Sequence, residues 1–259
     1  IKPRVFVTVR DTKRPQRAKS PYIDGCFEAM NVMGSVYINS QIPSSSGLGS
    51  SAAVTVATLS AINDEFKMNK TREDIANIAF EIEKKVQKGR ASPTDTTVST
   101  YGGIVLISGG SRRRLPPQNM HLVVGDSLVS HSTSRMVEQV AELKKTNPAI
   151  VDPVLDAIEG VSMSAIHHLS NPRELGRYMN MNHHLLEVLG VGHPQLAKMV
   201  LAARTAGAFG AKITGAGGGG SMVALCPKQL KHRVAGAIEA CEARAIVTGI
   251  DTEGVRREK

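Results

Sequence analysis

Apolar residues follow two different periods along the chain, which predicts a mixture of strands and helices. Short apolar runs predict strands over residues 5–9, 34–40, 103–108, 121–126, 211–213 and 222–225. Longer stretches with apolar residues three and four positions apart predict helices over 23–30, 50–66, 72–87, 134–145, 152–169, 174–189, 194–206 and 230–243. We found no internal repeat, so the pattern indicates a protein of mixed helices and strands in two lobes, without a repeat architecture.

A turn-rich segment in the middle of the chain is the best candidate for a linker. It contains glycines at 109–110, arginines at 112–114 and prolines at 116–117. A chain of 259 residues is long enough to bury one large or two medium cores. We therefore predict an N-terminal domain over 1–119 and a C-terminal domain over 120–259.

Composition narrows the class of protein without identifying it. The net charge of +9 invites a nucleic-acid interpretation, but the basic residues are scattered and only 3% of residues are aromatic. No apolar stretch approaches the roughly 20 residues that span a bilayer, and no signal peptide is visible. The three cysteines, Cys26, Cys226 and Cys241, are widely spaced and are expected to be buried free thiols. We expect a cytoplasmic protein that binds neither nucleic acid nor membranes.

The strongest chemical signal is a glycine loop that leads directly into an apolar helix. Its residues are Pro43, Ser44, Ser45, Ser46, Gly47, Leu48, Gly49, Ser50, Ser51, Ala52 and Ala53. Glycines allow backbone amides to converge on an anion, and the N-terminus of the helix adds its own amides and dipole. No lysine follows the glycines, which excludes the GxxxxGK[ST] phosphate loop. By itself the motif is either a phosphate site or an ordinary serine-capped loop.

The predicted helix over 72–87 carries the next candidate, Glu83. Thr71 and Asp74 have the spacing of a capping box at its start. Because Glu83 sits beside the apolar stripe, its carboxylate is either a solvated flank of the helix or a metal ligand directed into a cleft.

Asp95 follows in the segment ASPTDT at 91–96. Pro93 disfavours a helical conformation at Ser92, and the preceding helix is expected to end near Gly89. The sequence therefore predicts a tight polar loop that presents Asp95. In such a turn an aspartate is either a cap or a catalytic base.

Five glycines crowd positions 215–220, between two short apolar strands. Glycines alone would suggest a flexible linker, but apolar flanks favour a tight turn that passes close to a ligand.

In this order, the three segments resemble the motifs of the GHMP superfamily of small-molecule kinases. PSSSGLGSSAA resembles the ATP-binding motif, ASPTDT resembles the catalytic segment of archaeal-type mevalonate kinases, and KITGAGGGG resembles the third motif. The resemblance implies a two-lobed α+β GHMP kinase fold with an S5-like N-terminal domain and a ferredoxin-like C-terminal domain. It also implies Mg²⁺-dependent phosphorylation of the mevalonate 5-hydroxyl by ATP in isoprenoid biosynthesis. We also expect a homodimer. Another GHMP kinase and a non-catalytic relative are the alternatives.

The resemblance also assigns roles to individual residues. It implies that residues 43–53 bind ATP, that Ser51 and Glu83 hold Mg²⁺, and that Asp95 is the catalytic base. It places Asp95, Thr214, Gly215 and Ala216 on the acceptor side.

The chain departs from the family at its start. The family's first motif carries a lysine that assists the aspartate and a Glu-His pair, and residues from Ile1 onward contain no counterpart. We expect these residues alone to bind MgATP but to turn over mevalonate poorly.

Overall fold

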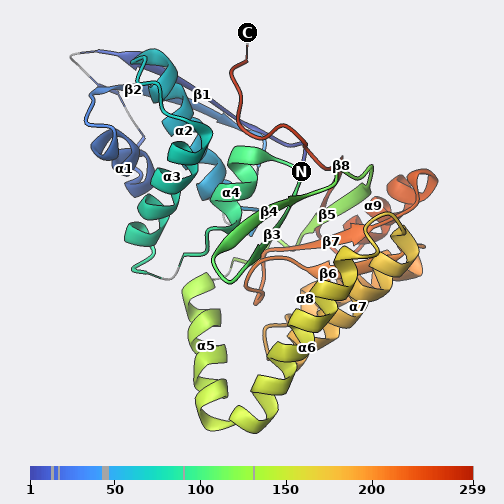
Figure 1. The fold of residues 1–259 in the computed structure, drawn as a ribbon. Helices are drawn as coiled ribbons and strands as arrows, with labels where there is room; N and C mark the ends of the chain where they lie inside the picture. Colours follow the sequence, from blue (N-terminus) through green and yellow to red (C-terminus); the bar gives the residue numbers. More distant parts are fainter. Residues whose placement is uncertain (13–14, 17, 43–46, 90, 131, 259) are drawn as a thin grey trace. The chain divides into compact units, whose positions relative to one another are not determined.

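The structure is a computed structural model that describes residues 1–12, 15–16, 18–42, 47–89, 91–130 and 132–258 (Figure 1). Its contacts divide the chain into two units. Apart from the gaps just given, unit 1 comprises residues 1–42, 49–117 and 251–258. Unit 2 comprises residues 47–48 and 118–250, with the same exception. Unit 1 is therefore built from both ends of the chain. The predicted domain boundary at residue 119 stays a prediction, because packing within units does not establish which segments fold as domains.

Unit 1 combines two small antiparallel sheets with four helices. One sheet pairs β1 (Val5–Asp11) with β2 (Gly34–Ser40), and the other pairs β3 (Ile104–Ser108) with β4 (Ser111–Leu115). The helices are α1 (Pro21–Ala29), α2 (Ser50–Glu65), α3 (Arg72–Val86) and α4 (Thr94–Tyr101). All but α4 are predicted by the apolar periodicity.

The core of unit 1 forms around α2. Leu59 and Ile62 of this helix are fully buried, together with Phe27 of α1 and Ile75 of α3. The first turn of α2 therefore has a fixed direction, because the body of the helix is surrounded by apolar side chains.

Helix α3 begins where the sequence predicts. The Thr71 side chain accepts a hydrogen bond from the Asp74 amide, and the Asp74 carboxylate accepts one from the Thr71 amide. The predicted capping box is confirmed, and it satisfies two donors that a helix start otherwise leaves unpaired.

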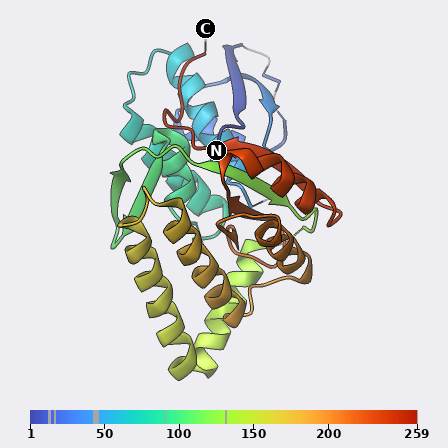
Figure 2. The same ribbon diagram turned by 90° about the vertical axis from the view of Figure 1, so that its right-hand side faces the viewer.

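Unit 2 contains a four-stranded antiparallel sheet in the order β6-β7-β5-β8. The strands are β5 (His121–Asp126), β6 (Gly210–Ile213), β7 (Ser221–Leu225) and β8 (Arg244–Gly249). The helices are α5 (Thr133–Thr146), α6 (Pro148–Ile166), α7 (Pro172–Val188), α8 (Pro194–Thr205) and α9 (Lys231–Glu239), with a 3₁₀ turn over Lys228–Leu230. Figure 2 shows α5 and α6 as two long helices joined at one end. Buried Val123, Leu196, Met222 and Ile238 belong to the core of this unit.

Two segments differ from the sequence prediction. The arginine run at 112–114, predicted as part of a linker, is strand β4, because it pairs with the apolar strand β3. Strand β8 is not among the predicted strands; it pairs with the buried strand β5 although its own first residue, Arg244, is exposed.

Two other expectations from composition can be compared with the structure. Cys26, Cys226 and Cys241 are free and buried, as predicted. Among the described residues, we find no helix with the length and apolar character needed to cross a bilayer.

Candidate active site

Ser51 and Glu83 meet at the N-terminus of α2. Ser51 lies in the first turn of that helix, and its hydroxyl donates a hydrogen bond of 2.9 Å to Glu83 Oε1 on α3. Glu83 is only 3% exposed. The carboxylate is therefore a buried group directed at the start of α2, and the interpretation of Glu83 as a solvated flank is wrong.

The surroundings of Glu83 disfavour its negative charge. Burial raises the pKa of this carboxyl, the nearby Asp95 carboxylate raises it further, and the hydrogen bond from Ser51 works in the opposite direction. A buried carboxylate beside a second one is a favourable setting for a cation, which would offset both charges.

Asp95 lies in the first turn of α4, and not in the loop that the sequence predicts. Pro93 does exclude the helix upstream, but it occupies the N-cap of α4, so the chain becomes helical immediately after it. Water exclusion by the surrounding protein raises the pKa of the Asp95 carboxyl. The residue as a whole is exposed, so a substrate can reach it.

Gly49 connects the glycine loop to Asp95. It is the N-cap residue of α2 and has a φ of 69°, in the left-handed region that favours glycine. A Cβ atom at this position would lie 3.2 Å from Asp95 Cγ. The absence of a side chain at Gly49 thus lets the Asp95 carboxyl approach the start of α2.

The rest of the predicted ATP loop is only partly described. Pro43, Ser44, Ser45 and Ser46 lie outside the described residues. Ser50, Ala52 and Ala53 belong to the first turn of α2, and Ala53 donates its amide to the Gly49 carbonyl.

The third motif forms the turn between β6 and β7, in unit 2. The Thr214 amide donates to the Ser221 carbonyl at 2.9 Å, and its hydroxyl lies 3.4 Å from the Gly47 carbonyl oxygen. A Cβ atom at Gly215 would lie 3.5 Å from the same oxygen. Gly47 belongs to unit 2 by its contacts, so the third motif holds this part of the ATP loop.

The structure therefore groups the predicted residues into two sets. Gly49, Ser51, Glu83 and Asp95 come together in unit 1. Gly47, Thr214 and Gly215 come together in unit 2, with Ala216 in the same turn.

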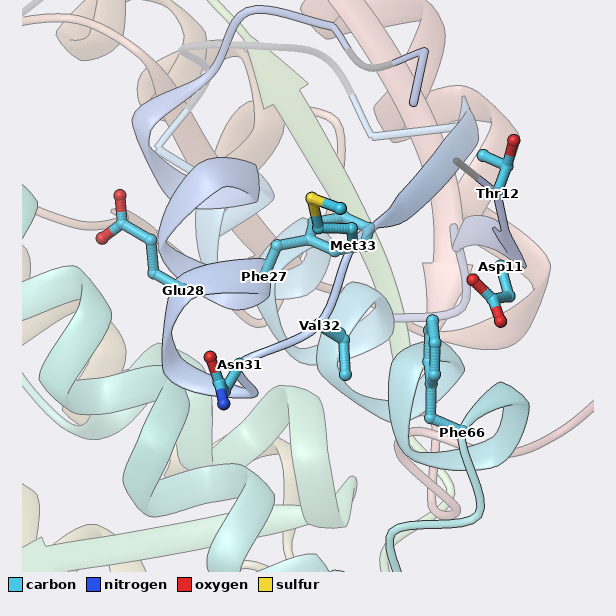
Figure 3. Close-up of a pocket in the computed structure, with 8 residues that line it drawn as sticks. All are labelled: Asp11, Thr12, Phe27, Glu28, Asn31, Val32, Met33 and Phe66. Carbon is cyan, nitrogen blue, oxygen red and sulfur yellow. The ribbon is translucent and has the colours of Figure 1, made fainter. Parts of the chain in front are cut away.

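A pocket in unit 1 lies away from these residues. It has a volume of about 510 Å³ and is lined by Asp11, Thr12, Phe27, Glu28, Asn31, Val32, Met33 and Phe66 (Figure 3). Phe66 follows the C-terminal end of α2, whereas Gly49 and Ser51 lie at its N-terminal end. None of the predicted site residues lines this pocket, so it carries no argument for the chemistry.

Sequence reasoning missed one contributor to this region, the segment 251–258. The Gly103 amide, just beyond α4, donates to the Asp251 carbonyl, and the Val255 amide donates to the Thr100 carbonyl of α4. The segment is polar and has no periodicity, so nothing in its sequence indicates where it binds.

The chain matches two family models. Residues 21–103 match the GHMP kinases N terminal domain, and residues 162–243 match the GHMP kinases C terminal model.

The chain is also similar to individual proteins that are named mevalonate kinase. The mevalonate kinase of Thermococcus sibiricus is 42% identical over 230 residues, which cover 86% of this chain and 68% of the relative. The mevalonate kinase of Methanothermobacter thermautotrophicus is 39% identical over 225 residues, 83% of this chain and 73% of the relative. The crystal structure of L. major mevalonate kinase in complex with R-mevalonate aligns with a TM-score of 0.84 at 24% identity, covering 97% of this chain and 86% of that one. At that identity the likeness shows the fold alone.

Proposed function

This chain belongs to the mevalonate kinases of the GHMP kinase family, and from that membership we propose that it transfers the γ-phosphoryl group of ATP to the 5-hydroxyl of mevalonate. The product would be 5-phosphomevalonate, an intermediate of isoprenoid biosynthesis. The predicted α+β GHMP kinase fold is confirmed by the two family matches and by the structural likeness. The observation that carries the proposal is the convergence of Ser51, Glu83 and Asp95 at the N-terminus of α2.

The glycine loop and the start of α2 would bind the phosphates of ATP. Gly47 and Gly49 both have φ near 70°, a conformation that turns backbone amides toward one side of the chain. The first amides of α2 and its dipole would add attraction for the anionic phosphates.

Ser51 and Glu83 fit a magnesium ion. Both present oxygen atoms, which this hard cation prefers, and the two oxygens already lie 2.9 Å from each other. Among the described residues, no cluster of three or more His, Cys, Asp or Glu side chains is suited to hold a metal. Phosphate oxygens and waters would therefore supply the other ligands, as is usual for nucleotide-bound Mg²⁺. When bound, the ion would neutralise charge on the β- and γ-phosphates.

Asp95 would orient the acceptor hydroxyl and take its proton as the phosphoryl group is transferred. Its solvent exposure leaves room for a substrate, and its contact with Gly49 fixes its distance from the phosphate loop. Within the described part of the chain, no lysine or arginine forms an ion pair with Asp95. Thr214, Gly215 and Ala216 would border the acceptor.

Two alternatives are less well supported. Another GHMP kinase would share the fold and the phosphate loop, but about 40% identity to mevalonate kinases over most of the chain favours mevalonate as the acceptor. A non-catalytic relative would not need a buried Glu83 bonded to Ser51 beside an accessible Asp95.

The test of the proposed function is Asp95→Asn, which keeps the size of the side chain and removes its basicity. We expect turnover to fall by two or more orders of magnitude, while MgATP binding stays close to that of the wild type. ADP release would be measured with mevalonate and with homoserine, galactose and phosphomevalonate as competing acceptors. Asp64→Asn is the matched control, because Asp64 is an exposed aspartate in the last turn of α2. Equal turnover in Asp95→Asn and Asp64→Asn would remove Asp95 from the chemistry.

The cytoplasmic location and the homodimer that we expect from the sequence remain proposals. Light scattering on the purified protein tests the second.

A further inference from the structure

Segment 251–258 follows the last strand of unit 2 but packs within unit 1. It contacts three elements there. On α3, the Arg72 guanidinium donates to the carbonyls of Glu253 and Val255, at 3.2 and 3.0 Å. On β4, Arg114 Nη2 donates to the Thr252 carbonyl at 3.1 Å. The third element is the C-terminal end of α4. Figure 1 shows this segment, in red, running beside α4.

The start of the segment is anchored at Asp251. One carboxylate oxygen pairs with the Arg4 guanidinium, and the other accepts the amides of Glu253 and Gly254, at 2.9 and 3.1 Å. The Asp251 carbonyl accepts the Gly103 amide at 2.6 Å. A single residue thus fixes both the turn of the segment and its contact with the chain beyond α4.

The contact with α4 is made by closely packed backbone. A Cβ atom at Gly102 would collide with the Gly254 amide nitrogen, and a Cβ atom at Gly254 would collide with the Thr100 carbonyl oxygen. Both glycines have φ near 67°. The Val255 amide donates to the same Thr100 carbonyl at 3.2 Å. The segment thus provides a hydrogen-bond donor for one of the carbonyls that the C-terminal end of a helix leaves unpaired.

Helix α4 needs such support from outside. It has eight residues, TDTTVSTY, most of them β-branched or otherwise poor helix formers. A helix of this length has little stability of its own in water. Its buried face, which includes Thr96, Thr97 and Thr100, packs on its neighbours α2 and α3. The segment completes this support at the end opposite to Asp95.

We propose that segment 251–258 is a positioning element of the active site: anchored on α3 and β4 by Arg72 and Arg114, it holds the end of α4 and so keeps Asp95 at the N-terminus of α2. Asp95 lies five residues before Thr100, about 7.5 Å along the helix, so a shift at one end is transmitted to the other. This inference rests on the proposed function, because it concerns the proposed catalytic base.

Two variants test the proposal. The first is the double substitution Arg72→Ala and Arg114→Ala, which removes the side-chain contacts to the segment and leaves its sequence intact. The second ends the chain after Ile250. The control is Arg113→Ala, since alternation along β4 directs Arg113 to the face opposite to Arg114. Each change is also made in the Asp95→Asn background.

We expect the double variant to lower kcat by about tenfold and the shortened chain by on the order of 100-fold, with the KM for MgATP changed by less than about threefold. In the Asp95→Asn background neither change should lower kcat further, because the segment acts through Asp95. Hydrogen exchange of the amides at 97–102 should accelerate by about tenfold or more, while those of α2 change little. Arg113→Ala should match the wild type in every measurement.

Equal losses of kcat with and without the Asp95→Asn substitution, or unchanged exchange in α4, would overturn the inference. If Asp95→Asn turns over mevalonate as fast as the wild type, the proposed role of Asp95 fails, and hydrogen exchange still decides whether the segment orders α4. The two failures are therefore distinguishable. If the shortened chain does not fold, the double substitution carries the test by itself.

Discussion

Helices α3 and α4 carry the two carboxylates of the candidate site, and they are stabilised in opposite ways. Helix α3 has 15 residues, a complete capping box and two lysines in its last turn. Helix α4 has eight residues, no side-chain cap and a run of threonines. The residue proposed to bind the metal therefore sits on a helix that its own sequence specifies, whereas the proposed base sits on one that its neighbours specify. The position of Asp95 should be more sensitive to remote changes than that of Glu83.

Gly49→Ala should have the largest effect after loss of Asp95 itself. The new Cβ would lie 3.2 Å from Asp95 Cγ, and a non-glycine residue would be held in the left-handed region. We expect kcat to fall by about 100-fold because Asp95 is displaced. Hydrogen exchange should accelerate in α4 but not in α3. Gly89→Ala is the control, since its φ is 85° and a Cβ there meets no atom within 4 Å. Equal acceleration of hydrogen exchange in α3 and α4 would show that α3 depends on its neighbours as much as α4 does.

Glu83→Gln should separate metal binding from stability. We expect productive use of MgATP to fall by about tenfold and to recover partly at high magnesium, because Mg²⁺ prefers an anionic oxygen. The ligand-free protein should unfold at a higher temperature than the wild type at neutral pH.

The stability half of this prediction follows from the raised pKa of Glu83. The folded protein binds the Glu83 proton more tightly than the unfolded chain does. The stability that protonation of Glu83 contributes is therefore fully present below the pKa of the unfolded chain, and it is lost as the pH rises through the pKa of the folded protein. Thermal unfolding from about pH 4 to about pH 8 measures this trend, which glutamine should abolish. An identical pH profile in the variant would show that the pKa of Glu83 is not perturbed.

Thr71→Ala removes the capping box of α3. We expect the free energy of unfolding to fall by about 1 kcal/mol, with kcat within about twofold of the wild type, because α3 retains its apolar contacts. Ser132→Ala removes the N-cap of α5 and is the comparison in unit 2. A large loss of kcat in Thr71→Ala would mean that α3 is as dependent on its surroundings as α4.

The smallest effect that we expect is the release of segment 251–258 at acidic pH. Burial opposes ionisation of Asp251, but the amides of Glu253 and Gly254 and the Arg4 guanidinium outweigh it and lower its pKa. The stabilisation is present above the unfolded pKa, about 3.9, and is lost as the pH falls through the lower folded pKa. Hydrogen exchange in α4 should accelerate below about pH 4. Asp251→Asn should show the faster exchange already at neutral pH, and a variant indistinguishable from the wild type would exclude this anchor.

The parts of the site that could be predicted are those with a local signal. The glycine loop, the apolar body of α2 and the capping box of α3 each depend on residues close in sequence, and the meeting of Ser51 with Glu83 follows once both helices pack on one core. The helical position of Asp95 could not be predicted, because threonines and Pro93 argue against a helix and packing decides otherwise.

The fold shows the same limit. Strand β4 exists because three arginines find a strand partner in β3, and β8 exists because β5 has a free edge to pair with. The partner of β8 lies far away along the chain, beyond the few residues that a periodicity samples. The partner of β4 is close, because β3 and β4 form a hairpin across Gly109 and Gly110, and the interpretation of this segment as a linker overlooked that local signal. The roles of Asp95, Glu83 and Thr214 depend in addition on ligands, and they stay predictions until kinetics test them.

Because the segment 251–258 belongs to unit 1, the order of synthesis has a consequence for this protein. The ribosome makes the body of unit 1 first and then residues 118–250 of unit 2 before the segment emerges. The segment begins 150 residues after α4 ends at Tyr101. At translation rates of about 5–20 residues per second, α4 would therefore wait roughly 8 to 30 s for its last contacts. A nascent chain would thus expose the threonine-rich helix to chaperones and proteases during that interval, and phosphoryl transfer would begin only after the segment has left the ribosome.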